Sequence, residues 1–124
     1  MRSQSRLITL ALLFLAAAAP AMAQNAEAGA VVFKQRCSTC HTTASGQRHG
    51  VGPNLAGLAG RRAASTDFSY STALRNSGLS WDAATLDRFL AAPSKLVPGT
   101  RMLIPIADAK QRADVVAYLG ALKK

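Results

Sequence analysis

The sequence predicts an all-α fold in which short helices are separated by long loops. Apolar residues recur at helical spacing in several short segments, and no segment shows the apolar–polar alternation of a half-buried strand. Glycine and proline are concentrated between those segments, where they favour loops. The 124 residues contain no internal repeat and no linker that would divide them, so we expect one folded domain.

The N-terminus has the three parts of a secretory signal peptide. Arg2 and Arg6 precede an apolar run at residues 7–19, and an Ala-x-Ala cleavage site ends at Ala23. A membrane-spanning helix needs about 20 apolar residues, so an uncleaved anchor is the less favoured alternative. We expect residues 1–23 to be removed on export, which leaves residues 24–124 as the folded domain with no permanent membrane span.

The composition limits the possible functions. The chain has 15 Lys and Arg residues and 6 Asp and Glu residues, a net charge of +9 that falls to +7 once the two arginines of residues 1–23 are removed. With only six Asp and Glu residues, an active site built on several carboxylates is not expected. Two cysteines exclude both a disulfide-dense scaffold and a zinc site built on four cysteines.

Two of the expected helices lie at the ends of the domain. The first covers residues 26–36. Its Gly29 costs about 1 kcal/mol relative to alanine in a helix, which indicates close approach by another element. The last helix begins after Asp108, its expected cap, and reaches Leu122 with an apolar stripe along one face.

Two more helices are expected between these. A short helix is predicted at residues 71–76. A longer one is predicted at residues 81–92, with Ser80 as its N-cap and Pro93 as the residue that ends it.

The remaining segments, residues 42–65 and 95–106, are rich in glycine and proline and are expected to be loops. A chain of this size buries only about 60–65% of its unfolded surface. Long loops in a compact domain normally need a reason to stay ordered. A large apolar cofactor at the centre would supply one.

The motif that carries chemistry is Cys-x-x-Cys-His at residues 37–41, the attachment signature of a c-type haem. Thiols three residues apart on a helical turn lie on one face, so Cys37 and Cys40 can both add to the vinyl groups of one porphyrin. His41 is then held beneath the iron, where its imidazole can ligate it. Other readings are a disulfide in an oxidising compartment, a thioredoxin-like pair and a zinc site. The thioredoxin-like pair needs a βαβ setting, and the zinc site would need Cys40 and His41 to point at one small ion.

The second axial ligand decides what such a haem does. An open second position on the iron permits chemistry with a substrate there, whereas a position filled by a protein ligand restricts the haem to electron transfer. Met102 is the only methionine after residue 23, and it lies in a stiff loop beyond the third expected helix. His49 is only eight residues from His41, too close in sequence to reach the opposite face of the haem. Met102 is therefore the expected ligand, and core packing is the alternative role for it.

With these motifs in order, residues 26–124 resemble the class I cytochromes c of the mitochondrial type and their bacterial relatives. Gly29 and Phe33 resemble the N-terminal helix of that family, and residues 98–102 (Pro-Gly-Thr-Arg-Met) resemble its methionine loop. The resemblance implies that the Pro53 carbonyl accepts from the free imidazole N–H of His41 and strengthens that ligand.

The resemblance also implies roles for residues outside the haem motif. Arg61, Tyr70 and Trp81 match positions that hold a haem propionate, an anion that needs charged or hydrogen-bonding partners when buried. A surface arginine and two core aromatics are the alternative reading. His49 resembles a histidine that braces two loops.

Two departures from the family pattern concern the methionine side of the haem. Phe89 stands where the family usually has a tyrosine near the methionine sulfur, and Leu74 stands where asparagine is common. The segment from Met102 to Arg112 is also about one residue shorter than the family leads us to expect. These differences predict a drier pocket around Met102.

The sequence therefore predicts a monomeric, soluble periplasmic electron carrier with one covalent haem c, held through Cys37 and Cys40 and ligated by His41 and Met102. We expect no substrate turnover and no nucleic-acid binding. The alternatives are a haem subunit of a periplasmic dehydrogenase or oxidase complex, and a haem enzyme or sensor in which Met102 dissociates. The expected partners are redox proteins, a reductase or dehydrogenase donor and an oxidase acceptor, with acidic docking surfaces. Their basic counterparts in this chain are Arg36, Arg48, Lys95 and Arg101, which lie in or next to the segments expected to frame the haem edge. Ordinary solubilising charges are the alternative role for them.

Overall fold

The computed structural model describes residue 16 and residues 24–124, so the expected signal peptide lies almost entirely outside the described residues. The prediction of an all-α fold is confirmed. The helices are α1 (Ala26–Arg36), α2 (Thr72–Arg75), α3 (Ala83–Ala91), α4 (Pro93–Leu96) and α5 (Ala109–Gly120). In the described part of the chain, the only β pairing outside these helices is an isolated bridge between Arg62 and Ser80. None of the described helices is long and apolar enough to cross a membrane.

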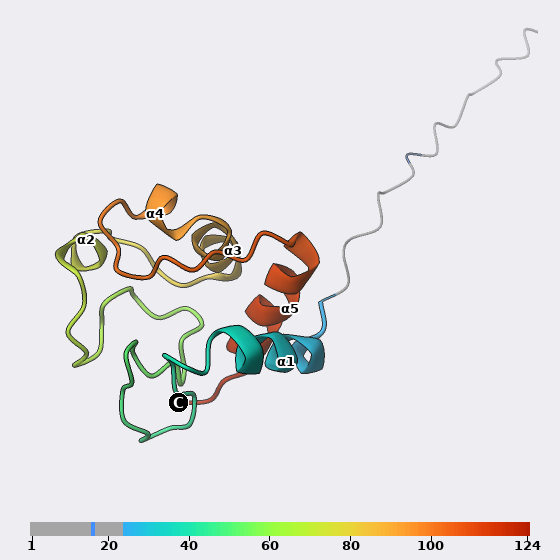
Figure 1. Cartoon of the computed structure of the whole chain (residues 1–124), viewed down its shortest axis with the longest axis horizontal. Helices are drawn as coiled ribbons and strands as arrows, with labels where there is room; N and C mark the ends of the chain where they lie inside the picture. Colours follow the sequence, from blue (N-terminus) through green and yellow to red (C-terminus); the bar gives the residue numbers. More distant parts are fainter. Residues whose placement is uncertain (1–15, 17–23) are drawn as a thin grey trace, which may run out of the picture.

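The two terminal helices pack against each other, and α3 lies beside α5 (Figure 1). The first turn of α1 is capped by the side chain of Asn25, which accepts from the Ala28 N–H at 3.0 Å. Gly29 is buried in the helix crossing, and a Cβ added there would lie 1.9 Å from the Asp114 carbonyl oxygen of α5. The close approach expected from Gly29 is therefore present.

The boundaries of the middle helices differ from the prediction. Asp82, not Ser80, caps α3, because its carboxylate accepts from the Thr85 N–H at 2.8 Å while Ser80 takes part in the β bridge. Pro93 does end α3, but it also begins the short helix α4, which extends by two residues into the expected loop of residues 95–106. A proline fits there because the first turn of a helix has no use for its missing N–H.

The C-terminal helix begins as predicted and ends earlier. The Asp108 side chain caps α5 by accepting from the Gln111 N–H at 2.8 Å. The helix stops at Gly120, two residues before Leu122. Its apolar stripe packs into a core contributed by α1, α3, α5 and the connecting loops. The buried members of this core are Phe33, Leu55, Leu58, Trp81, Leu86, Phe89, Leu90, Val97, Ile106, Val115, Val116 and Leu119.

Candidate functional site

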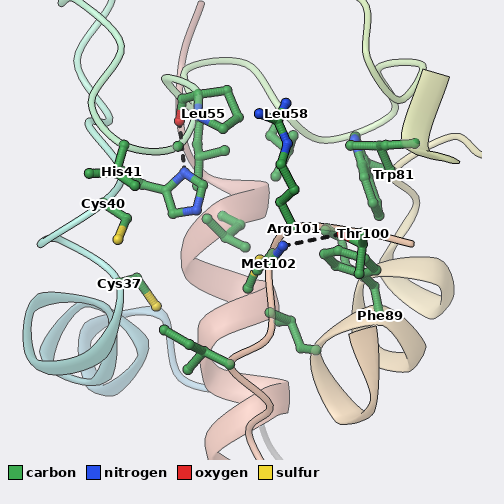
Figure 2. Close-up of a pocket in the computed structure, with 18 of the residues that line it drawn as sticks. Cys37, Cys40, His41, Leu55, Leu58, Trp81, Phe89, Thr100, Arg101 and Met102 are labelled. Atoms are coloured by element: carbon green, nitrogen blue, oxygen red, sulfur yellow. Dashed lines mark hydrogen bonds between the residues drawn. The ribbon is translucent and has the colours of Figure 1, made fainter. Parts of the chain in front are cut away.

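A largely apolar cavity of about 480 Å³ opens between the core and the long loops. Its volume falls in the range of small-molecule and cofactor sites, about 300–1,000 Å³. All eight residues predicted to form the site line it, although they come from distant parts of the chain; Figure 2 labels five of them, Cys37, Cys40, His41, Trp81 and Met102. They are Cys37, Cys40, His41, Pro53, Arg61, Tyr70, Trp81 and Met102.

The cysteines lie in the turn that directly follows α1. The N–H groups of Cys40 and His41 both donate to the Cys37 carbonyl at 3.0 Å, which closes the turn and places both thiols at the same wall of the cavity (Figure 2). The two cysteines do not form a disulfide with each other. Burial raises the pKa of the Cys37 thiol, and the neighbouring Arg36 guanidinium acts in the opposite direction.

The His41 imidazole is held in one orientation by the loop opposite. Its Nδ1–H donates to the Pro53 carbonyl at 2.8 Å, so Nε2 is the nitrogen left free to ligate a metal. Burial lowers the pKa of His41, and the bond to Pro53 only partly offsets this, so the ring favours the neutral form that a ligand requires. The free edge of the ring faces the side of the cavity where Met102 lies (Figure 2).

Gly52 allows this loop to approach the imidazole so closely. A Cβ at position 52 would lie 2.5 Å from His41 Cε1 and 2.8 Å from its Nδ1, closer than side chains pack. The sequence alone does not indicate this role for Gly52. A glycine immediately before Pro53 was the available signal, but the contact itself depends on the fold.

Met102 is held at the cavity by the residues before it. Its N–H donates to Oγ1 of the buried Thr100 at 3.3 Å. The guanidinium of Arg101 donates to the Ser69 carbonyl, which ties this loop to the segment after Asp67. Met102 is half-buried and packs against the core. Its thioether is a soft donor that suits haem iron.

Arg61, Tyr70 and Trp81 differ in how far their polar atoms are already engaged. Arg61 donates through Nη1 to the Ala56 carbonyl at 2.9 Å, while its buried Nε has no hydrogen-bond partner among the described residues. The Tyr70 hydroxyl shares a 2.5 Å hydrogen bond with Thr66. Trp81 is buried, and its ring packs at 5.0 Å from that of Phe89.

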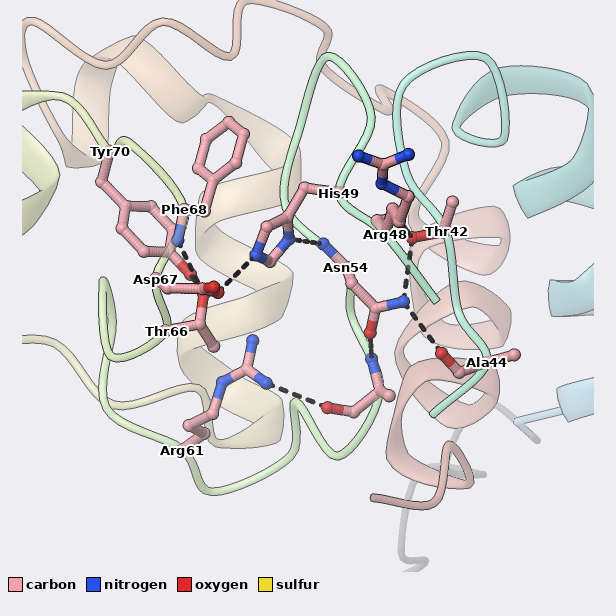
Figure 3. Close-up of polar contacts among 11 residues, drawn as sticks. Thr42, Ala44, Arg48, His49, Asn54, Arg61, Thr66, Asp67, Phe68 and Tyr70 are labelled. Atoms are coloured by element: carbon pink, nitrogen blue, oxygen red, sulfur yellow. Dashed lines mark hydrogen bonds and ion pairs between the residues drawn. The ribbon is translucent and has the colours of Figure 1, made fainter. Parts of the chain in front are cut away.

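His49 joins two loops, as expected for a brace (Figure 3). Its Nδ1 accepts from the Asn54 N–H at 2.8 Å, and its Nε2 lies 2.7 Å from the Asp67 carboxylate. This hydrogen bond lowers the pKa of Asp67. The Phe68 ring packs edge-on against the imidazole at 5.3 Å. His49 does not line the cavity that holds His41.

The buried Asn54 is a second brace, which sequence reasoning missed. Its side-chain amide donates to Thr42 Oγ1 at 2.8 Å and to the Ala44 carbonyl at 3.0 Å, and its oxygen accepts from the Ala56 N–H at 2.9 Å (Figure 3). Because Asn54 follows Pro53, these bonds fix the carbonyl that orients His41. An asparagine in a glycine-rich loop is the available sequence signal, and it does not specify these partners.

The basic residues expected around the haem edge divide into two groups. Arg36 and Arg101 line the cavity. Arg48 lines a separate polar depression beside His49, and Lys95 lines neither. Of the four, Arg36 and Arg101 thus lie at the cavity itself, whereas the turn at residues 44–49 and helix α4 carry the other two.

The residues present fit a covalently attached haem. The paired thiols, the free imidazole nitrogen and the apolar wall suit its vinyl groups, iron and ring. The unpartnered Nε of Arg61 suits a buried carboxylate, since a buried polar group without a partner is costly. Cys37, Cys40, His41, Met102 and Arg61 are the residues that would hold the group.

Comparison with known proteins gives a consistent result. The family model described as Cytochrome c matches residues 26–123. Cytochrome c of Guizotia abyssinica is 43% identical over 105 residues, which cover 83% of this chain and 95% of that protein. Cytochrome c2 of Rhodoblastus acidophilus is 43% identical over 103 residues, covering 82% and 95%. The solved structure of cytochrome cH from Methylobacterium extorquens matches with a TM-score of 0.71 at 43% identity, over 77% of this chain and 96% of that one.

Proposed function

Because the chain belongs to the cytochrome c family, whose members are electron carriers with one covalent haem c, we propose that it is a periplasmic carrier with His41 and Met102 as axial ligands. Cys37 and Cys40 form the haem-attachment motif. The bound haem supplies an iron that changes between Fe(III) and Fe(II) by one electron.

The observation that carries the ligand assignment is the convergence of His41 and Met102 on one apolar cavity. The Pro53 bond leaves His41 Nε2 free, and Thr100 and Arg101 fix the backbone that carries Met102. A neutral thioether ligand favours Fe(II), and an apolar pocket disfavours the extra charge of Fe(III). The thioether and the apolar pocket therefore both raise the reduction potential. The chain thereby sets the potential of its cofactor.

The same residues favour electron transfer over turnover of a substrate. His41 and Met102 would together occupy both positions of the iron at which a substrate could bind. The surrounding loops are held by His49 and Asn54 through side-chain hydrogen bonds, so little needs to move when the charge of the iron changes. We propose that this chain alone is not an enzyme.

We propose that partners dock at the mouth of the cavity. Val51, Leu103 and Ile104 line the cavity and are respectively 80%, 66% and 48% exposed. Arg36 and Arg101 lie beside them and carry positive charge. An apolar surface with a basic rim fits a redox partner with an acidic docking face. Electron transfer to such a partner should slow as salt rises, because screening weakens charge steering, which gives about 10–1,000-fold in rate.

Export and the monomeric state belong to the same proposal. Residues 1–23 have the composition of a cleaved signal peptide. Mass spectrometry of the protein from a periplasmic extract should give a chain that begins near Gln24 and carries one haem. Size-exclusion chromatography with light scattering should give the mass of one copy.

A potentiometric titration of the holoprotein tests the ligand assignment. We expect a single reversible one-electron transition, and a lower potential in Met102→Ala because the thioether is lost. Leu103→Ala is the matched control, since it shortens the neighbouring exposed side chain of the same loop. Equal potentials in the parent and Met102→Ala would show that Met102 does not ligate the iron.

A further inference from the structure

The loop that carries Met102, residues 100–106, is attached to the rest of the domain mainly at its ends. Arg101 donates to the Ser69 carbonyl near the start, and the Ile106 N–H donates to the Leu90 carbonyl at 2.8 Å at the end. Between these points Leu103 and Ile104 are largely exposed. The middle of the loop therefore needs another attachment if Met102 is to stay in place.

That attachment is a single arginine from the opposite side of the cavity mouth. Arg36 Nη2 donates to the Pro105 carbonyl at 3.0 Å. Among the described residues, this is the only hydrogen bond made by Leu103, Ile104 or Pro105. The bond joins residues 69 positions apart in the chain.

The position of Arg36 connects the two sides of the haem site. It is the last residue of α1 and directly precedes Cys37, the first attachment cysteine. It lines the cavity together with Leu103 and Ile104. Its hydrogen bond thus links the covalently attached side of the site to the loop that carries the sixth ligand.

The chemistry of both partners suits a restraint. An arginine donates through a rigid planar group that is more weakly hydrated than an ammonium, so it keeps a hydrogen bond at a surface better than lysine does. Proline fixes its own φ and restricts the residue before it. A restraint at the Pro105 carbonyl therefore acts on Ile104 and the backbone that leads back to Met102.

We propose that Arg36 is a positioning residue that holds the loop of residues 100–106 closed over the cavity and so slows the dissociation of Met102 from the iron. This rests on the proposed ligation by Met102. The competing explanation is that Arg36, which is exposed, acts only as a surface charge. The two explanations differ in what a neighbouring charge on the same helix should do.

The test measures how fast imidazole binds to the ferric holoprotein as its concentration is raised. If Met102 must leave first, the rate reaches a limit equal to the rate of its dissociation. We expect Arg36→Gln to raise that limit about three- to tenfold, the range set by loss of one hydrogen bond. Lys34→Gln, which removes one positive charge from the last turn of α1, should stay within about twofold of the parent.

Hydrogen exchange gives a second readout on the same proteins. The Ile106 amide, which donates to the Leu90 carbonyl, should exchange faster in Arg36→Gln than in Lys34→Gln, while amides of α3 and α5 stay unchanged. Equal limiting rates in the parent and Arg36→Gln would overturn the proposal, as would equal acceleration by both variants. A parent whose rate never reaches a limit would instead contradict ligation by Met102, so the two failures are distinguishable.

Discussion

The crossing of α1 and α5 gives a sharp test of the packing. In Gly29→Ala the new Cβ would lie 1.9 Å from the Asp114 carbonyl oxygen, 2.5 Å from its carbon and 2.9 Å from Tyr118 Cβ. Ordinary contact starts at 3.4 Å, so the helices would have to separate by about 1.5 Å. Because two of the three obstructing atoms are backbone, no side-chain rotation relieves the contact.

The expected cost follows from two opposing effects. Overpacking of this kind costs about 1–3 kcal/mol and more where the backbone must move. Alanine recovers about 1 kcal/mol of helix propensity. Because the backbone must move, we take the upper end of that range and expect a net loss of about 2 kcal/mol in the free energy of unfolding, which lowers the melting temperature by about 8–16 °C in a domain of this size.

The assay is guanidinium and thermal unfolding of the holoprotein, followed by circular dichroism. Gly120→Ala is the matched control, because this glycine ends α5 and a Cβ there meets nothing within 4 Å. It should leave stability unchanged or raise it by up to about 1 kcal/mol. If Gly29→Ala were as stable as Gly120→Ala, the close crossing would be refuted.

Three further outcomes are expected. The ion pair with Lys110 and the Asn25 N–H hold the pKa of Asp114 below its usual range. The ionised Asp114 carboxylate therefore stabilises the fold above the usual carboxyl pKa, and this stabilisation is lost as pH falls through the pKa of Asp114 in the folded state. The difference in free energy of unfolding between the parent and Asp114→Asn, measured by urea unfolding, should therefore shrink between pH 7 and pH 3. A difference that stays constant would contradict this. Asn54→Ala loses three side-chain hydrogen bonds, so its free energy of unfolding should be about 2–3 kcal/mol lower than that of the parent. A decrease below about 1 kcal/mol would contradict the role of Asn54 as a brace. Phe89→Tyr places a hydroxyl at the buried cavity wall and should shift the reduction potential measured by voltammetry, whereas an unchanged value would mean that the hydroxyl does not reach the ligands.

The sequence predicted the terminal helices well because their signals are local. Asp108 was the expected cap of α5, and the bounds of α1 match the prediction. The start of α3 was misplaced because Ser80 and Asp82 are both good caps, and the choice depends on a β bridge with Arg62 that only the tertiary structure provides. Proline at position 93 was read as the end of a helix, and its second role, at the start of α4, has no distinct local signal.

The site was predictable where a motif specifies the chemistry. The spacing of residues 37–41 and the position of Met102 were enough to place these residues in one cavity. Their roles toward the haem stay predictions. The contacts between Arg36 and Pro105 and between Gly52 and His41 depend on how distant segments meet, so no local pattern indicates them.

Carbon monoxide binding tests the central claim, that Met102 closes the iron position left free by His41, most directly. The measurement compares the reduced holoprotein and its Met102→Ala variant at neutral pH in buffer saturated with carbon monoxide. We expect the parent to exclude carbon monoxide on the timescale on which Met102→Ala binds it, because only the variant has an open axial position. A parent that binds it as rapidly as Met102→Ala would contradict both the ligand assignment and the function as a closed electron carrier.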